Sequence, residues 1–377
     1  MSERVFVLVI PGLRMNDLEQ MPYLRKLVCD VAPLSPSFPA VSPVVQTCMT
    51  TGLLPQDHGI VATGEYDRAT GELVRKRKAI ATPTEYVWMA LRKYYRDFRC
   101  DLVGMYPVDN SAADHATADL LRQSCAGSDD CAAIMTAMQE SISGDAQLVM
   151  TRLPQLDAPG HQFGPSSQEF AVARAKLDED IERSSQHAIN HSAQERATPP
   201  LWIIASEYVI VPVERAVSPC ALLQAGGIRI AADDDGNISK NTVRVMVEGQ
   251  SAHVFIDHRI DSQSAAATTA QIADLFQSID CIAEVLDQDG RARRDLAHPA
   301  AGDLVLVAET DTVFLDHTAF LNHTADPINL PKGAHGGPAE TLPQRGLIAA
   351  SEPGVLMGSS AMSDFDVAGL VLRQFGV

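Results

Sequence analysis

Residues 39–60 read PAVSPVVQTCMTTGLLPQDHGI, a mostly apolar segment in which a serine stands directly before a proline. Proline is favoured in the first turn of a helix because it lacks an N–H that would be unpaired there. We therefore predict that Ser42 is the N-cap of a helix over Pro43–Thr51. A helix N-terminus also attracts anions, so Ser42 has two interpretations: a structural cap, or a nucleophile beside a bound phosphate.

Around this segment, short apolar runs alternate with helical patterns. This alternation is typical of parallel strands that are buried on both faces, with helices between them. The predicted strands are Val5–Ile10, Leu102–Tyr106, Gln147–Leu153, Leu201–Ala205, Gly346–Ala350 and Gly354–Met357. The predicted helices are Asn16–Val28, Pro43–Thr51, Ser166–Asn190 and Asp364–Phe375. We expect an α/β fold with a mostly parallel sheet, helices on both faces, and functional residues at the carboxyl ends of the strands.

Residues 215–330 depart from this alternation. The segments TVRVMVEGQSAHVFIDHR, SAAATTAQIADLFQSI and CIAEVLDQDG predict two strands, a helix and a further strand. We therefore predict an α/β core formed by residues 1–214 and 331–377, with a compact α+β lobe inserted between them. The lobe could serve as a lid or a substrate domain. Residues 65–95 form a second, smaller excursion.

The composition of the 377 residues is that of a globular protein, with 46% hydrophobic and 21% charged residues. The formal charge of −18 argues against a nucleic-acid partner, because binding a phosphate backbone requires clustered Lys and Arg. Seven scattered cysteines without CxxC spacing are typical of a reducing compartment. No apolar run is long enough for a signal sequence or a membrane span. We therefore expect a cytoplasmic protein with no membrane partner, whose oligomeric state these features do not determine.

Two further segments contain side chains that suit a metal ion. In LPQLDAPGHQFGP, Asp157 and His161 follow a predicted strand across a Pro-Gly turn, and a carboxylate and an imidazole converging from one loop suit a zinc-like ion. In KGAHGGPAET, His335 lies among glycines, where the backbone can approach a ligand closely. The alternative is structural: a turn-forming aspartate with a surface histidine, and a flexible glycine-rich segment around an exposed histidine.

Glu207 and Tyr208 form the last candidate pair. They follow the apolar strand in WIIASEYVIVPV, where a carboxylate is rarely buried unless it is paired or binds a metal. We therefore treat Glu207 as a candidate metal ligand and Tyr208 as a possible additional site residue.

In this order, these segments resemble the alkaline phosphatase superfamily, and within it the nucleotide pyrophosphatase/phosphodiesterase-like branch. VFVLVIPGLRMNDL is similar to the family's opening strand and PAVSPVVQTCMTTGLLPQDHGIVATGEYD to its nucleophile block. LDAPGHQFGP is similar to its D…GH loop, GAHGG to its late His-Gly element and MSDFDVAGLVLRQFG to its closing helix. The resemblance covers most of the core, is weak across the lobe, and implies an alkaline-phosphatase-like fold.

The resemblance also implies a role for each matched residue. Ser42 stands at the position of the covalent nucleophile, which is more often Thr in these phosphodiesterases. Asp157, His161 and His335 stand at the three ligand positions of one metal ion, the first metal position below. In such an enzyme two metals flank the phosphorus, one activating the attacking oxygen and one stabilising the leaving oxygen. The implied cofactor is a divalent metal, with zinc expected and manganese or magnesium as alternatives.

The second metal position departs from the family pattern. The family has an aspartate ligand just after the first strand, where this chain has Pro11, and an Asp-His pair where this chain has Glu207 and Tyr208. A glutamate can still bind a metal, whereas the side chain of proline cannot.

A bacterial branch of EboC-like alkaline phosphatase family proteins is a closer resemblance, carried by SEYVIVPV, GQSAHVFI, LAHPAAGDLVLVA and PAVSPVVQT. This branch also lacks the first aspartate, which implies a rearranged site that Glu248 and His253 from the lobe would complete. The alternative is that Glu248 and His253 are strand residues that face solvent. One or two ions per chain are therefore expected.

These features predict a metal-dependent hydrolase of phosphate esters or pyrophosphates, acting on a small phosphorylated substrate through a covalent phosphoenzyme at Ser42. Two other functions stay open. A chain with one ion or none could be a binding or scaffold protein in which Ser42 only caps its helix. A phosphoryl-transfer mutase or transferase could use the lobe as a lid.

Overall fold

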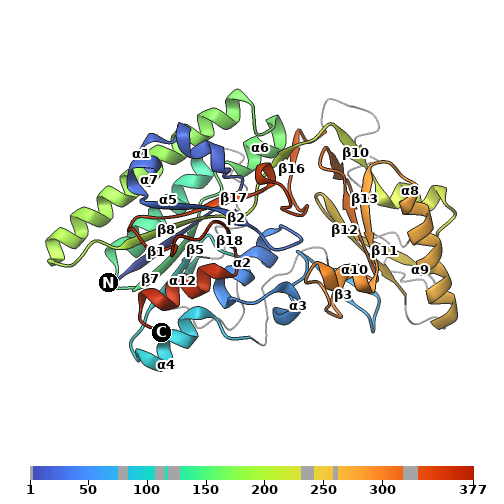
Figure 1. Cartoon of the computed structure of the whole chain (residues 1–377), viewed down its shortest axis with the longest axis horizontal. Helices are drawn as coiled ribbons and strands as arrows, with labels where there is room; N and C mark the ends of the chain where they lie inside the picture. Colours follow the sequence, from blue (N-terminus) through green and yellow to red (C-terminus); the bar gives the residue numbers. More distant parts are fainter. Residues whose placement is uncertain are drawn as a thin grey trace.

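The computed structural model describes residues 3–74, 84–106, 115–117, 128–230, 242–257, 262–316 and 330–377. These residues form two main sheets, one of eight strands with helices on both faces and one of four strands whose two longer helices pack on one face (Figure 1). The expected α/β fold with a mostly parallel sheet is confirmed. The domain boundaries at residues 214 and 330 stay a prediction.

The eight-stranded sheet has the order β18-β2-β17-β8-β1-β7-β5-β6. Strands β8, β1, β7, β5 and β6 are parallel, β17 pairs antiparallel with β8 and β2, and β18 pairs parallel with β2. The strand bounds are β1 Val5–Ile10, β2 Asp30–Ser35, β5 Cys100–Val103, β6 His115–Thr117, β7 Leu148–Arg152, β8 Leu201–Ser206, β17 Gly346–Ala350 and β18 Met362–Ser363. The carboxyl ends of β7, β1 and β8 therefore meet at one edge.

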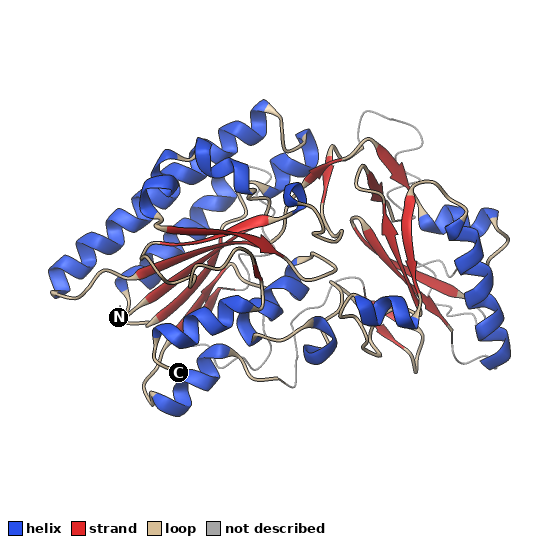
Figure 2. Cartoon of the chain, viewed as in Figure 1, coloured by secondary structure: helices blue, strands red, loops and turns tan. Residues whose placement is uncertain are grey.

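The sequence of β1 explains why both faces of this sheet are covered. Its three valines belong to one hydrophobic cluster, and Phe6, Leu8 and Ile10 belong to another on the opposite face. Every residue of β1 is buried, and a fully buried apolar side chain contributes about 1.5 to 3 kcal/mol. The valine face packs against α2 Ser42–Thr51, α4 Val87–Tyr94 and α12 Asp366–Gln374, and the other face against α1 Pro22–Leu27, α5 Ser128–Ser143 and α7 Gln168–Glu195 (Figure 2).

The four-stranded sheet is antiparallel, with the order β11-β12-β14-β13. Its strands are β11 Val243–Glu248, β12 Ser251–Ile256, β13 Ile282–Leu286 and β14 Leu304–Ala308. One face is covered by α8 Pro219–Ala225 and α9 Ser262–Gln277, through a cluster that includes Leu223 and Phe276. The opposite face packs against Phe38, Val61 and Tyr66, which come from the segments around α2. The lobe is therefore joined to the first sheet by a buried apolar contact.

Shorter elements complete the connections. Two strand pairs lie where the chain passes between the sheets, β9 Val211–Pro212 with β16 Gly333–Ala334, and β10 Arg215–Val217 with β15 Thr312–Phe314. The others are the hairpin β3 Glu65–Asp67 and β4 Glu72–Val74, the helices α3 Pro55–His58, α6 Asp157–Phe163 and α10 Gln288–Arg293, and the 3-10 helices η1 Met15–Gln20 and η4 Leu342–Gln344.

Three predicted elements require correction. Gly354–Met357 is not a strand but a series of turns, in which Gly354 and Met357 both have positive φ. The predicted helix Asn16–Val28 is split into η1 and α1 because Pro22 cannot continue a preceding helix. The strand predicted over Leu102–Tyr106 ends at Val103, since Gly104 adopts φ 61°.

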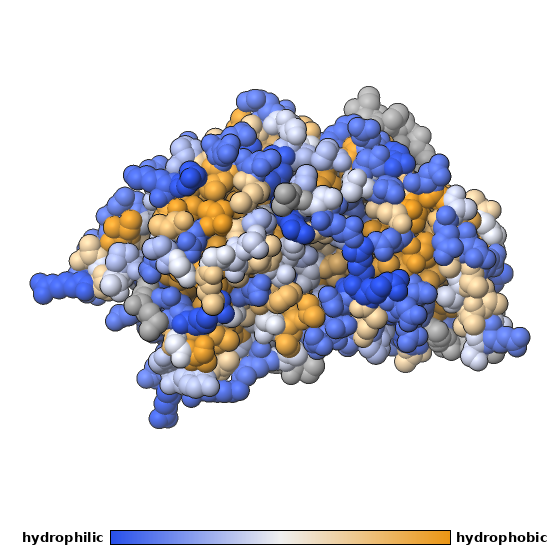
Figure 3. Space-filling view, viewed as in Figure 1, coloured by the Kyte–Doolittle hydropathy of each residue, from blue (hydrophilic) through white to orange (hydrophobic). Residues whose placement is uncertain are grey.

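The face seen in Figure 3 is covered mostly by polar residues, with apolar residues in separate patches rather than one continuous area. In the part of the chain that the structure describes, no helix combines the length and the apolar character needed to cross a membrane.

Candidate metal and phosphate site

The site residues lie where the central parallel strands end. β1 pairs with β7 on one side and β8 on the other. Arg152 is the last residue of β7, Pro11 follows β1, and Glu207 follows β8. A backbone hydrogen bond from Gly12 N to Tyr208 O, 2.8 Å long, holds the segments after β1 and β8 together. Pro11, Arg152 and Glu207 therefore lie at neighbouring strand ends.

Three predicted ligands converge beside these strand ends. α6 begins at Asp157, and His161 lies four residues later, so both project from the same side of the helix. With His335, their ligand atoms all lie within 4.8 Å of one another. His161 Nε2 is 3.5 Å from Asp157 Oδ1, close to the separation of about 3.3 Å expected for two ligands of one tetrahedral zinc ion.

Both imidazole rings are oriented by backbone carbonyls. His161 Nδ1 is 2.9 Å from Gly333 O, and His335 Nδ1 is 2.8 Å from Ala40 O. The first contact joins α6 to β16, which lie side by side in Figure 1. An Nδ1–H donated to a carbonyl leaves the Nε2 lone pair for a metal, as is usual for histidine ligands. The three residues therefore fit a divalent ion.

The lobe supports the backbone that carries His335. Gln250 N, in the turn between β11 and β12, donates a hydrogen bond of 2.8 Å to His335 O. The approach is so close that a Cβ at Gly336 would lie 2.0 Å from Glu248 O. Glycine is required at this position, which also has φ 96°, because no other residue fits the space. The glycines around His335 therefore serve close backbone packing.

Electrostatics at the site favour the metal-binding forms of Asp157 and His335, whereas His161 holds its proton more strongly while no ion is bound. Burial opposes the charge of Asp157, but the hydrogen bond with His161 and the positive charge of Arg152 hold its pKa well below the usual range. Burial and the nearby His161 lower the pKa of His335 to about 4. Burial acts to lower the pKa of His161 as well, but its hydrogen bond with Asp157 and the charge of that carboxylate raise it. An ionised carboxylate and a neutral imidazole are the ligand forms.

A buried cation lies next to the three ligands. Arg152 is 8% exposed, and its Nε donates to Glu207 Oε2 at 2.8 Å. Arg152 Nη2 lies 3.3 Å from Tyr208 Oη and 3.6 Å from Asp157 Oδ2. Glu207 Oε1 accepts from Gln46 Nε2 at 2.7 Å. Burial acts to lower the pKa of Arg152, but Glu207, Tyr208 and Asp157 together outweigh it and raise the pKa, so the guanidinium stays charged.

This arrangement gives Glu207 protein partners in place of a metal ion. Glu207 was expected to bind a metal, but both of its carboxylate oxygens accept hydrogen bonds from protein donors, and the side chain is fully buried. Within the described residues, the group of side chains able to hold an ion consists of Asp157, His161 and His335. Glu207 is placed as the counter-ion of Arg152.

Tyr208 connects the nucleophile position to the ligands. Its hydroxyl donates to Asp157 Oδ1 at 3.1 Å, and the side chain of Ser42 acts on the same phenol in the direction of a lower pKa. Its ring stacks on His335, with 3.8 Å between ring centroids and 14° between planes. Burial, together with the charges of Asp157 and Glu207, raises the pKa of Tyr208 well above its usual value, so the phenol is neutral and donates. Tyr208 therefore interacts with both Ser42 and Asp157.

The predicted N-cap is shifted by one residue. α2 begins at Ser42, and the N-cap is Val41, whose backbone is extended and whose side chain makes no capping hydrogen bond. Ser42 is half-buried in the first turn, with Pro43 following it. Ser42 is therefore a residue of the first turn rather than the cap.

The lobe residues Glu248 and His253 lie elsewhere. The solvent-facing interpretation is wrong, because Glu248 is 5% and His253 is 0% exposed. Glu248 accepts from Thr63 N at 2.8 Å and from Thr63 Oγ1 at 2.6 Å. His253 Nδ1 accepts from Gly302 N at 3.0 Å, and burial lowers its pKa to about 3. In the described part of the chain, neither belongs to the group of possible metal ligands.

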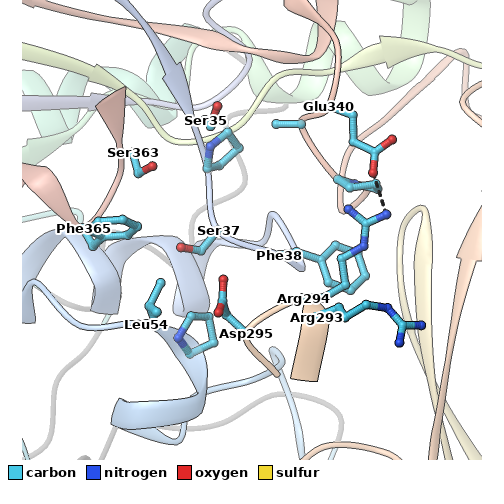
Figure 4. A pocket seen from close by; sticks show the side chains of 14 residues that line it. Ser35, Ser37, Phe38, Leu54, Arg293, Arg294, Asp295, Glu340, Ser363 and Phe365 are labelled. Atoms are coloured by element: carbon cyan, nitrogen blue, oxygen red, sulfur yellow. Dashed lines mark ion pairs between the residues drawn. The ribbon is translucent and has the colours of Figure 1, made fainter. Parts of the chain in front are cut away.

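A cavity of about 220 Å³ lies between the two parts of the molecule (Figure 4). Phe38 and Phe365 line it from the first sheet's side, and Arg293 and Arg294 from the lobe. Arg294 forms an ion pair with Glu340 at its wall. The lining does not include Ser42 or the three metal ligands, so this cavity is separate from the ion site.

Sequence reasoning missed Arg152 and Gln46. Arg152 ends the apolar strand LVMTR. A charged residue at the end of a buried strand needs a partner, and the same argument was applied to Glu207 but not to Arg152. Gln46 is a polar residue within the apolar first half of α2 and is 3% exposed. Both could have been noticed as polar residues in buried segments, but their partners lie far away in the sequence.

Comparison with known proteins agrees with this geometry. No curated protein matches the sequence. Solved structures of murine and human ectonucleotide pyrophosphatase/phosphodiesterase 5 match with a TM-score of 0.73 and 12% identity, covering 99% of this chain and 95% of theirs. A third match, with the same values, is an inactive variant of the murine protein in complex with AMP.

At 12% identity these structures show a shared fold. A sequence profile described as Type I phosphodiesterase / nucleotide pyrophosphatase matches residues 5–337, a span that contains Ser42 and all three candidate ligands. The chain therefore belongs to the type I phosphodiesterase/nucleotide pyrophosphatase family.

Proposed function

We propose that the chain hydrolyses phosphodiester or pyrophosphate bonds, with Ser42 as nucleophile and a divalent metal ion held by Asp157, His161 and His335. The family is metal-dependent. The observation that carries the proposal is the convergence of Asp157, His161 and His335, beside Tyr208, whose hydroxyl donates to Asp157 and whose pKa Ser42 influences. An oxygen nucleophile one side chain away from three metal ligands is the arrangement that phosphoryl transfer requires.

The donor set suits zinc. One carboxylate and two imidazoles leave a fourth tetrahedral position open for substrate, as in catalytic zinc sites. A bound ion would supply a Lewis acid for a phosphoryl oxygen. Manganese and magnesium are alternatives that a metal assay distinguishes.

The chain's own residues position the substrate and form the bond. Ser42 lies in the first turn of α2, where backbone N–H groups and the helix dipole favour an anion. Ser42 Oγ bonds to phosphorus while the bond from phosphorus to the leaving oxygen breaks, and the proton of Ser42 ends on that oxygen. Water then cleaves the phosphoserine and restores the hydroxyl, so each cycle consumes one water molecule.

The proposed substrate is a small phosphorylated molecule. The AMP complex of the murine relative supports a nucleotide-like ligand for this chain as well. The net charge of −18 makes the local positive charge of the ion and Arg152 necessary for binding any anion.

We also infer that the chain works in a reducing compartment such as the cytoplasm. The six cysteines of the described residues are free thiols, and four of them are buried. Buried free cysteines behave as small apolar side chains and need no oxidant to be stable.

The test is hydrolysis of bis(p-nitrophenyl) phosphate and of a dinucleotide pyrophosphate, after loading with zinc, manganese or magnesium. Ser42→Ala should reduce hydrolysis to background while changing the free energy of unfolding by about 1 kcal/mol or less, because Ser42 does not cap α2 and alanine is a good helix former. Ser218→Ala is the matched control, because it removes a hydroxyl that caps α8 in the lobe and should leave hydrolysis unchanged.

Mass spectrometry of the quenched wild-type reaction should find a phosphorylated peptide that contains Ser42. Full activity of Ser42→Ala would remove Ser42 from the mechanism. A wild-type chain that binds its ion and cleaves neither substrate would favour the binding or scaffold function.

A further inference from the structure

The second metal position does not fit an ion in this chain. Pro11 has no ligand atom. Both oxygens of Glu207 already accept hydrogen bonds, and the hydroxyl of Tyr208 donates to Asp157. A second divalent ion would require donor atoms that are free of such contacts.

A guanidinium lies among these same side chains. Arg152 contacts Glu207 and Tyr208, which stand at the second metal position, and it also contacts Asp157, a ligand of the first. These three contacts span 2.8 to 3.6 Å. A fixed positive charge is therefore held where the family pattern places an ion.

Helix α2, which carries Ser42, also helps to hold the guanidinium of Arg152 in place. Its partner Glu207 is held by Gln46, which lies on α2 one turn after Ser42. The other end of the Gln46 amide accepts from Tyr106 N at 2.7 Å. Glu207 and Gln46 therefore link Arg152 to the helix that carries Ser42, and this hydrogen-bonded network orients the charge before any ligand binds.

We propose that the Arg152 guanidinium takes the place of the second metal ion, so that the site works with one ion and one fixed protein cation. The ligand class is a phosphate oxyanion, bound between the ion and Arg152. The contacts described above use Nε and Nη2, and the side chain is 10% exposed, so we assign Nη1 to the oxyanion. This inference deepens the proposed function and rests on it for the phosphoryl ligand.

The first test counts ions per chain by native mass spectrometry, on protein purified without chelator and equilibrated with zinc or manganese. The expected count is one for the wild type, one for Glu207→Gln, and none for Asp157→Asn. A wild-type count of two that falls to one in Glu207→Gln would overturn the inference, because Glu207 would then be a ligand.

The second test measures the affinity for inorganic phosphate by calorimetry, on desalted protein that carries its bound ion. Arg152→Gln should weaken binding by about 10-fold or more, and Arg152→Lys should weaken it less, because an ammonium keeps the charge without the planar fork. The matched control is Arg174→Gln, since Arg174 is also 8% exposed and paired with a buried carboxylate, Asp17. This control should bind phosphate like the wild type.

Arg152→Gln leaves Glu207 buried without its partner, which can prevent folding. The double variant Arg152→Gln/Glu207→Gln removes that unpaired charge and should show the same loss of phosphate affinity. Unchanged affinity in the double variant and in Arg152→Lys would overturn the role of Arg152.

The outcomes separate this inference from the proposed function, because neither test measures hydrolysis. One ion with phosphate binding that depends on Arg152, but no hydrolysis of any ester, would reject the hydrolase and keep the inference. Two bound ions, together with hydrolysis that depends on Ser42, would keep the hydrolase and reject the inference about Arg152.

Discussion

The two halves of the site obtain positive charge in different ways. At the first metal position, Asp157, His161 and His335 converge with both imidazoles oriented by carbonyls, so that ligand atoms are directed at a common point. At the second, Arg152 and Glu207 already satisfy one another. The first half depends on an exchangeable ion, whereas the second is built from the chain itself.

On our proposal, the comparison teaches that an arginine at the end of a neighbouring strand can supply one fixed positive charge where the family pattern has a divalent ion. Pro11 and Tyr208 look like losses when each is compared with the family pattern alone. Both differences are explained if Arg152, which lies between Glu207 and Asp157, supplies the positive charge at this position. The predictions below are arranged from the largest expected effect to the smallest.

Asp157 belongs to both halves, so its substitution should have the largest effect. Asp157→Asn removes a ligand charge and the acceptor near Arg152, and hydrolysis should fall to background with no ion retained. The matched control is Asp178→Asn, because Asp178 is a buried carboxylate that accepts from Tyr23 N and Leu24 N, far from the ion site. Retention of the ion by Asp157→Asn, measured by native mass spectrometry, would contradict the first half of the comparison.

Glu207→Ala should disrupt the Arg152–Glu207 pair at the second metal position without affecting the three candidate metal ligands. It leaves Arg152 buried without its carboxylate, which costs about 3 to 5 kcal/mol of stability, while the ion count stays at one. Asp17→Ala is the control, since it unpairs the buried Arg174 in the same way. Denaturant unfolding should show comparable destabilisation of both variants, and only Glu207→Ala should lose phosphate affinity. Equal phosphate affinities would show that the Arg152 pair is structural only.

His253, in the lobe, offers a further test, because its imidazole was a candidate ligand at the second metal position. Burial, with a smaller contribution from Arg291, lowers its pKa from 6.5 to about 3. Between these values the unfolded chain binds more protons, so stability rises with pH and is lost as pH falls, by about 2 kcal/mol at pH 5. His253→Asn should remove that loss and leave the ion count unchanged.

Urea unfolding of His253→Asn and wild type at pH 7 and pH 5 measures this effect. Part of the acid dependence should persist in the variant, because burial also lowers the pKa of His58 to about 3. An identical pH dependence of the two proteins would show that His253 does not titrate in this way, and loss of the ion would return it to the ligand set.

Tyr208→Phe should have the smallest effect. It removes the hydroxyl that interacts with Ser42 and Asp157 but keeps the ring that stacks on His335. We expect kcat to fall about 10-fold, the equivalent of one hydrogen bond, with the ion retained. Steady-state kinetics with a chromogenic phosphodiester measure it, and an unchanged kcat would show that this hydroxyl plays no part in the reaction.

The sequence predicted the central sheet because its strands are local apolar runs. β1 and β17 have the predicted bounds, β7 is one residue shorter at each end, and β8 is one residue longer at its end. β2 was missed because DVAPLS contains a proline and polar residues, and its strand character comes from pairing with β17. Long-range pairing of this kind leaves no local pattern.

The same limit applies to the site. Asp157, His161 and His335 each stand in a recognisable motif, and the structure brings them together. Arg152 stands in none, and its meaning depends on Glu207, 55 residues away in the sequence. A charge that compensates for a missing ligand is visible only when the side chains of separate strands are placed in space.

The most direct measurement is anomalous X-ray diffraction at the zinc edge, on crystals of the wild-type chain equilibrated with zinc. We predict one anomalous peak, within bonding distance of Asp157, His161 and His335, with the guanidinium of Arg152 between Glu207 and Asp157. A second peak beside Glu207, with Arg152 displaced, would contradict the account.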